Sequence, residues 1–296
     1  MENKPICFGP AGNCDAFHAA GYKSTRQVFA FLSRWGLGAY EYQCGRGVRL
    51  SEEAAADIRK EAAQYGVRVS LHAPYFISLA SAEEEKRENS IRYILDSARA
   101  VTALGGDRIV VHPGGLGGRS RGEATALACE TLQRAQLALD EAGLSGVHIC
   151  PEVMGKLNQL GDLEEVLTFC GVDERFLPCV DFGHLNSRTG GSLDSREAYA
   201  AVLERIGDAL GEERLRQFHI HFSKIEYTAG GEKRHLTFAD TQFGPEPEPL
   251  MELLASRGLT PTVICESSGT QTADAAAMQA IFARFFEKSD SSAEKK

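Results

Sequence analysis

Side chains of the types that bind metal ions in proteins stand at the ends of strand-like stretches along this chain. His72 closes the apolar stretch 67–72, His112 closes 109–112, and Glu152 follows 148–151. The same placement recurs after or within the later stretches, for Asp181, His184, His219, His221 and Glu266. In a parallel barrel the carboxyl ends of all strands meet at one mouth. We therefore expect these side chains to form one shared site.

The residue types define the chemistry of that site. Imidazoles and carboxylates without thiolates suit Zn²⁺, with Mn²⁺ as the alternative. One catalytic zinc takes about three protein ligands and keeps one open position. The chain offers more candidates than one ion can use, so we expect several ions. Carboxylates can bridge two ions, an arrangement that clamps the attacking and leaving oxygens of a phosphate.

The elements that must position these residues alternate regularly. Short β-branched stretches are followed by helix-like stretches whose apolar residues recur at threes and fours. The helix-like stretches are 24–35, 51–65, 83–104, 123–142, 163–170, 195–210, 247–257 and 273–286. Eight strands, each followed by a helix, predict an α/β protein with a (β/α)8 TIM barrel. We expect one domain over residues 1–288, a disordered polar tail over 289–296, and a long loop over 223–249.

The composition of the chain indicates its class of protein and its cellular compartment. The chain has 296 residues, 43% of them hydrophobic, and a net charge of -9, which disfavours a generally basic nucleic-acid surface but permits a local basic groove. No apolar run approaches the roughly 20 residues that a membrane helix needs. The eight cysteines include no Cys-x-x-Cys pair. We expect a monomeric cytoplasmic protein with reduced cysteines and no membrane segment.

Six short segments carry a family resemblance. In order, they are Leu71-His72-Ala73-Pro74-Tyr75, Val111-His112-Pro113-Gly114, Pro151-Glu152, Val180-Asp181-Phe182-Gly183-His184, His219-Ile220-His221-Phe222-Ser223-Lys224 and Cys265-Glu266-Ser267. Their order resembles that of the endonuclease IV family of apurinic/apyrimidinic endonucleases, over roughly residues 6 to 286. The resemblance implies a zinc-dependent hydrolase that cuts duplex DNA 5′ to abasic sites in base excision repair.

The resemblance also implies a ligand set for three zinc ions. His72, His112 and Glu152 would hold the first ion. Glu152 would bridge to a second ion that is also held by Asp181, His219 and Glu266, and the third would take His184 and His235. Glu152 and Glu266 would be the catalytic carboxylates of this zinc pair.

Four further residues are expected to contact DNA. The resemblance places Tyr75 and Phe76 in a loop that inserts into DNA, and Arg46 in a second such loop. Lys224 lies in the long segment at the functional face. Apolar wedges and arginines suit unstacked DNA. The alternatives are ordinary packing at the barrel mouth for Tyr75 and Phe76, and a solvated loop cation for Arg46.

The sequence departs from the family pattern in two places. The family has Asp-x-His at the third zinc, whereas Lys233 stands two residues before His235 here. A cation beside zinc is repulsive, so the third ion is weak or absent unless Glu232 substitutes through a shift of one residue. The second departure is that His219 and His221 alternate onto the same face of one strand. We favour His219 as the ligand for its spacing to Lys224, with His221 as the alternative.

Two other functions stay open. The first is a sugar or sugar-phosphate isomerase or epimerase of the xylose-isomerase-like barrels, with a single metal. Glu152, Asp181, Glu266 and either His219 or His221 would hold that ion, and a count of one ion per chain would favour it. The second is a barrel that binds metal or nucleic acid without catalysis.

Overall fold

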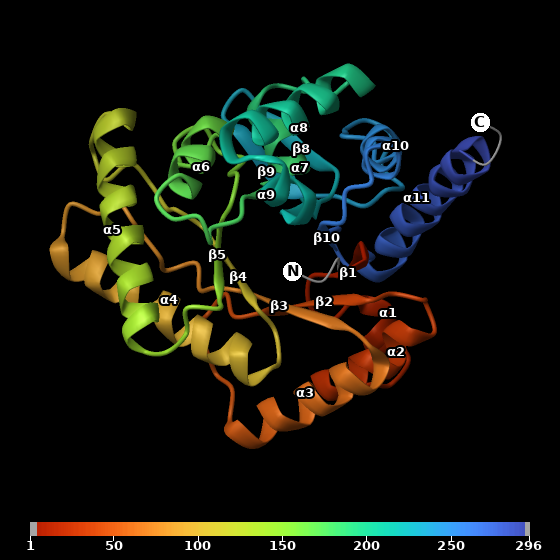
Figure 1. Ribbon diagram of the computed structural model, residues 1–296, viewed down its shortest axis with the longest axis horizontal. Helices are drawn as coiled ribbons and strands as arrows, with labels where there is room; N and C mark the ends of the chain where they lie inside the picture. The colour runs from red at the N-terminus through yellow and green to blue at the C-terminus, as the bar shows by residue number, and fades with distance from the viewer. Residues whose placement is uncertain (1–4, 294–296) are drawn as a thin grey trace.

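Eight short parallel strands form the centre of the computed structural model, which describes residues 5–293 (Figure 1). The strands are β1 (Cys7–Pro10), β2 (Ala39–Gln43), β3 (Arg68–His72), β4 (Arg108–Val111), β5 (His148–Pro151), β6 (Cys179–Asp181), β7 (His219–Phe222) and β10 (Thr262–Cys265). They form two four-stranded sheets, in the orders β1-β10-β7-β6 and β2-β3-β4-β5. Parallel bridges between Ala11 and Glu41 and between Glu152 and Cys179 join the two sheets. The structure therefore confirms the predicted TIM barrel.

Closure between β1 and β2 depends on one glycine. A Cβ atom at Gly9 would lie 1.8 Å from the carbonyl oxygen of Ala39. With no side chain in the way, Gly38 donates a backbone hydrogen bond to Phe8 (3.1 Å) and Gly12 donates one to Glu41 (3.0 Å). These bonds replace a regular ladder where the first strand meets the second, and they bring the polar ends of both strands to the same mouth.

Helices surround the barrel and bury its outer face (Figure 1). The larger ones are α2 (Val28–Ser33), α3 (Glu52–Tyr65), α4 (Glu84–Ala103), α5 (Arg121–Glu141), α6 (Leu163–Cys170), α8 (Arg196–Leu210), α10 (Glu248–Arg257) and α11 (Gln271–Ala293). On α4, Ile91, Ile94, Ala98 and Val101 are buried at the predicted spacing of threes and fours. The Ser51 and Ser120 side chains accept backbone hydrogen bonds at the starts of α3 and α5, which explains where those helices begin.

Several elements were not predicted. They are the short helices α1 (Asp15–Ala19), α7 (Phe182–Arg188) and α9 (Glu212–Gln217), and an antiparallel hairpin of β8 (Ile225–Thr228) and β9 (Gly231–His235). Within the predicted helix 24–35, Thr25–Gln27 form a 3₁₀ turn. The hairpin occupies part of the segment 223–249 that was predicted to be a loop. Such short elements carry too few residues for a clear hydrophobic period.

The predicted tail boundary also needs correction. Helix α11 continues to Ala293, so residues 289–293 are helical rather than disordered, and residues 294–296 lie outside the described part of the chain. No glycine or proline stands between residues 271 and 293 to end this helix.

Within residues 5–293, none of the helices combines the length and apolar composition that crossing a bilayer would require.

Candidate metal centre

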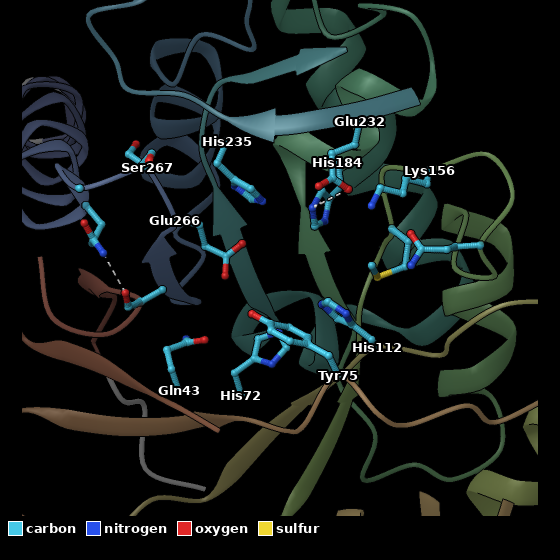
Figure 2. Close-up of a pocket in the computed structure, with 16 residues that line it drawn as sticks. Gln43, His72, Tyr75, His112, Lys156, His184, Glu232, His235, Glu266 and Ser267 are labelled. Carbon is cyan, nitrogen blue, oxygen red and sulfur yellow. Dashed lines mark hydrogen bonds and ion pairs between the residues drawn. The ribbon is translucent and has the colours of Figure 1, made fainter. Parts of the chain in front are cut away.

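The carboxyl ends of the barrel strands open into a polar pocket of about 520 Å³ (Figure 2). Its wall includes His72, His112, His184, His235 and Glu266, which come from strands, from the residues after them, or, for His184, from α7. Figure 2 shows these side chains directed into the pocket from several sides. The expected gathering of strand-end residues at one mouth is therefore present.

A first group of ligand atoms consists of His72, His112 and Glu152. Glu152 Oε2 lies 3.3 Å from His72 Nε2 and 2.9 Å from His112 Nε2. His72 is oriented by its other nitrogen, Nδ1, which lies 2.8 Å from the carbonyl oxygen of Ala73. A backbone partner of this kind fixes the tautomer that leaves Nε2 free to bind a metal.

A second group shares Glu152 with the first and adds Asp181, His221 and Glu266. Each residue offers a ligand atom, and these atoms lie within 4.8 Å of one another. Oε1 of Glu152 is 3.2 Å from His221 Nδ1, which is also 3.5 Å from Glu266 Oε1. Glu152 faces both groups through its two oxygens, as a carboxylate that bridges two ions would.

The structure places His221, and not the favoured His219, in the second group. In the parallel register His221 pairs with Asp181, whereas His219 pairs with Cys179, two residues further from the mouth. At about 3.3 Å per residue, this puts His219 roughly 7 Å deeper in the barrel. There His219 Nε2 lies 3.0 Å from Glu41 Oε2. Burial lowers the pKa of His219 to about 4, an effect that the Glu41 contact only partly offsets, so this imidazole is neutral.

A third group consists of His184, Glu232 and His235, so the acidic ligand comes from Glu232 and not from the position of Lys233. The β8–β9 register pairs Glu226 with Arg234 and Tyr227 with Glu232, which leaves Lys233 as the extra residue of a β-bulge. A bulge shifts side-chain alternation by one residue. Glu232 Oε2 consequently lies 3.5 Å from His184 Nε2, while Lys233 and Arg234 both pair with Glu226. The expected repulsion between Lys233 and a third ion is therefore absent.

One glycine brings the hairpin close enough to complete this third group. Gly231 has a φ of 91°, and a Cβ atom there would lie 2.2 Å from the carbonyl oxygen of Gly155. Glu232 donates its backbone N–H to the same oxygen at 3.1 Å. The hairpin is thus held against the loop that follows β5, beside His184.

Charges within the site are strongly coupled. Burial alone would raise the pKa of Glu152, but His112 and His221 outweigh it and hold that pKa well below the ordinary value. Burial raises the pKa of Glu266, against the lowering effect of His221 and His235. Burial alone would lower the pKa of His184, but the surrounding carboxylates, Asp181 first, raise it to about 10. Without a cation, protons on His184 and His221, whose pKa values are raised, balance the buried carboxylates.

The donor set fits divalent cations. Glu152 Oε2 and Asp181 Oδ2 are buried and make no well-directed hydrogen bond among the described residues. An unsatisfied buried carboxylate oxygen is costly. Nitrogen and oxygen donors directed at common points, with no thiolate among them, are the ligands that Zn²⁺ and Mn²⁺ take in proteins.

The side chains predicted to contact DNA differ in their setting. Tyr75 and Phe76 are 55% and 58% exposed at the mouth. The Tyr75 ring lies over the imidazoles, with centroid distances of 5.2 Å to His72 and 5.1 Å to His112. Arg46 is exposed on the neighbouring loop, whose Gly45 carbonyl accepts the Tyr75 N–H at 3.3 Å. The two loops expected to insert into DNA therefore lie side by side.

The expectation that Lys224 contacts DNA was wrong. The side chain is buried, and its Nζ donates to the Asp240 carbonyl at 2.7 Å and to Glu246 Oε1 at 2.6 Å. These bonds tie the end of β7 to the segment before α10. Lys224 is therefore a structural cation without a surface to offer to DNA.

Sequence reasoning missed Glu41, which lies fully buried in β2 beneath the second group. Burial would raise its pKa, but His221 and His219 outweigh this effect and keep the carboxylate ionised, with a pKa well below the ordinary value. The available signal was a charged residue inside the apolar stretch Ala39-Tyr40-Glu41-Tyr42, because a buried charge requires partners.

Comparisons with known sequences find an uncharacterised relative and several probable endonucleases 4. An uncharacterised protein from Methanocaldococcus jannaschii is 36% identical over 238 residues, which cover 80% of this chain and 84% of the relative. A probable endonuclease 4 from Bifidobacterium longum is 26% identical over 270 residues, covering 85% and 91% of the two chains. Such relatives confirm the resemblance to endonuclease IV.

Solved structures and a family model agree on the fold. A D-tagatose 3-epimerase-like protein superposes with a TM-score of 0.69 at 20% identity, covering 97% of this chain and 100% of its own. Endonuclease IV from Thermus thermophilus gives a TM-score of 0.68, also at 20% identity, covering 95% and 99%. The model of the xylose isomerase-like TIM barrel matches residues 29–285. The chain therefore belongs to the xylose isomerase-like TIM barrel family.

Proposed function

We propose that this protein is a metal-dependent phosphodiesterase that cuts duplex DNA 5′ to abasic sites, as a base excision repair enzyme. The observation that carries the proposal is the number of connected ligand groups. Glu152 belongs both to the group with His72 and His112 and to the group with Asp181, His221 and Glu266. A third group, at His184, lies beside them. Phosphate ester hydrolysis is the reaction that uses several ions clamped around one substrate.

The chain would hold three divalent cations, with zinc favoured and manganese as the alternative. The first would take His72, His112 and Glu152, the second would take Glu152, Asp181, His221 and Glu266, and the third would take His184, Glu232 and His235. When bound, such ions polarise a phosphate and stabilise charge on the attacking and leaving oxygens.

Other residues of the mouth would bind and orient the DNA. Tyr75 and Phe76 are exposed, and the Tyr75 ring covers His72 and His112, so a nucleotide without a base would enter beside these rings. Exposed aromatic side chains insert into unstacked DNA steps. Arg46 supplies a cation on the adjacent loop.

A second candidate is an isomerase or epimerase that acts on a sugar or sugar phosphate with a single ion. The group of Glu152, Asp181, His221 and Glu266 would suffice for that chemistry. The similarity in fold to an epimerase-like protein makes it worth testing. This candidate gives no role to His72, His112 and His235, which all line the same pocket.

One experiment separates the two candidates. The metal-loaded protein is incubated with a duplex that carries a single abasic site, and with an intact duplex of the same sequence as the control. We expect incision on the 5′ side of the abasic site and two or three metal ions per chain by elemental analysis. One ion per chain, with no incision under any divalent metal and turnover of a ketose, would replace the nuclease with the epimerase.

A further inference from the structure

Beneath the metal centre, Glu41 has four polar neighbours, three of them hydrogen-bond partners and the fourth, His221, in ion-pair contact without a well-directed hydrogen bond. Its Oε1 lies 3.0 Å from His221 Nε2 and 3.2 Å from Gln43 Nε2. Its Oε2 lies 2.9 Å from Ser70 Oγ and 3.0 Å from His219 Nε2. An ionised carboxylate has about four acceptor sites, so the surroundings match its full capacity.

The partner behind His221 differs from those behind the imidazoles of the other groups. His72 Nδ1 lies 2.8 Å from the Ala73 carbonyl oxygen, and His184 Nδ1 lies 3.0 Å from that of Val153. His235 Nδ1 lies 2.8 Å from the Ser223 hydroxyl. The partners of His72 and His235 are neutral, and His184 Nδ1 also lies 3.2 Å from Asp181 Oδ2, itself a member of the second group. His221 instead faces a fully buried carboxylate that belongs to none of the three groups.

A purely structural role does not explain a carboxylate at the buried position of Glu41. A buried carboxylate loses its hydration, and well-packed apolar residues usually stabilise a core as well or better. Other inward-facing positions of the barrel are apolar, such as Val110, which pairs with His72, and Ile264, which pairs with His221. A charge retained here must act through the groups it touches, and of these only His221 reaches a metal group that opens to the pocket.

We infer that Glu41 is a positioning residue for the second metal group. Its Oε1 faces Nε2 of His221 at 3.0 Å, so the carboxylate stabilises a proton there and favours the tautomer in which Nδ1 is free to bind a metal. That nitrogen lies 3.2 Å from Glu152 Oε1 and 3.5 Å from Glu266 Oε1, among the other ligands. A carboxylate behind a ligand histidine orients the ring and strengthens the imidazole as a donor. Ser70 and His219 hold the second oxygen of Glu41, and Gln43 shields the first from the pocket.

The inference rests on the metal groups of the proposed function but not on the identity of the substrate. Metal affinity tests it directly, through competition of the protein with a chelator for Zn²⁺ and through the absorption spectrum of bound Co²⁺. In Glu41→Gln the amide oxygen can face only one of the two imidazoles, and the amide N–H groups oppose the other. We expect affinity at the second group to fall roughly 10- to 100-fold, the usual cost of losing such a partner.

Ser70→Ala is the matched control. It removes one hydrogen bond from the same carboxylate but leaves the contact between Glu41 and His221 in place, so affinity should change far less. The site of His184, Glu232 and His235 should keep its ion in both variants. A well-folded Glu41→Gln protein with wild-type affinity at every site would overturn the inference.

A measurement on the wild-type protein covers the case in which Glu41→Gln fails to fold. Nitrogen NMR of labelled histidines distinguishes a metal-bound nitrogen from a protonated one. We expect Nδ1 of His221 to be bound to the metal and Nε2 to carry a proton. Metal on Nε2 would refute the positioning role alone, whereas a wild-type protein without any ion at His221 would refute the proposed function as well.

Discussion

The metal groups around Glu152 and the group at His184 are built in different ways. Around Glu152, the ligands come from the ends of barrel strands or the residues that directly follow them, and most of them are buried. The His184 group takes one ligand from α7 and two, Glu232 and His235, from a hairpin at the rim, where both are partly exposed. The barrel fixes the first arrangement, whereas a bulge in one hairpin fixes the second.

Because of this difference, we expect the groups around Glu152 to be more rigid than the group at His184. The strand ends are held by parallel ladders on both sides, so their ligands are pre-organised. Three carboxylates also surround the second group, compared with one in the His184 group. We expect the ions at Glu152 to bind more tightly and to matter more for catalysis.

The largest effect is expected from Glu152→Gln. Because Glu152 belongs to two groups, the variant should lose both of their ions and nearly all incision, by more than the roughly 10- to 100-fold that loss of an outer partner costs. Metal content, incision of an abasic duplex and circular dichroism check this. Glu164→Gln, an equal change on the exposed face of α6, is the control and should keep full activity. Wild-type incision by Glu152→Gln would contradict the bridging role.

A pair of histidines on β7 gives the next largest effect. His221→Asn should lose the ion of the second group and most activity, because Nδ1 of His221 is one of its ligand atoms. His219→Asn should keep its metal content and instead lower the free energy of unfolding by about 1–3 kcal/mol, because it leaves a buried polar group unsatisfied. Elemental analysis and denaturant unfolding distinguish the two. The reverse result would restore the assignment of His219 as the ligand.

A smaller effect is expected at the hairpin. Glu232→Gln should remove the third ion and reduce incision less than Glu152→Gln does, because the ions at Glu152 stay bound. Lys233→Gln is the matched neighbour: the bulge directs Lys233 to Glu226, so this variant should retain the third ion. If Lys233→Gln instead tightened the third ion substantially, the lysine would lie near the metal, contrary to the register.

The smallest expected effect is a difference between the two regions in how their metal affinity depends on pH. The pKa of His184 is raised to about 10, so a cation at the third group must displace a proton. Its affinity should then fall by about tenfold per pH unit for each proton displaced as the pH drops. The pKa of His221 is raised as well, so the second group also loses affinity as the pH drops. We expect the third ion to leave first when the pH is lowered from about 8 to about 6, because its group has one carboxylate and the second group has three. Metal content after dialysis at each pH checks this, and loss of the Glu152 ions first would contradict it.

The same proton affects the metal-free protein with the opposite sign. A folded-state pKa above the ordinary value of 6.5 contributes stability that is fully present below that value. This contribution is lost as the pH rises through about 10. Removal of metal should therefore leave a protein whose thermal unfolding temperature falls at alkaline pH, and Glu232→Gln should weaken that fall.

Much of the centre could be predicted because strand ends in a barrel share one mouth. That rule alone was enough to predict the positions of His72, His112, Glu152, Asp181 and Glu266. His221 did not follow from it, because strand alternation gives it the same face as His219 and depth is set by register. The place of Glu232 in the third group depends on a bulge that the sequence does not reveal. Lys224 was misassigned because a basic residue near a functional face can equally be a buried ion-pair partner.

By itself, the sequence determined the barrel, the mouth and the residue types that make a multi-metal site possible. Periodicity and ligand chemistry are local properties, and they can be read from neighbouring residues. Only the tertiary structure decided which imidazole joins the second group and which acid joins the third. It also decided that Glu41 lies behind His221. Those choices depend on register, on one bulge and on side chains far apart in the chain, whose distances no local pattern encodes.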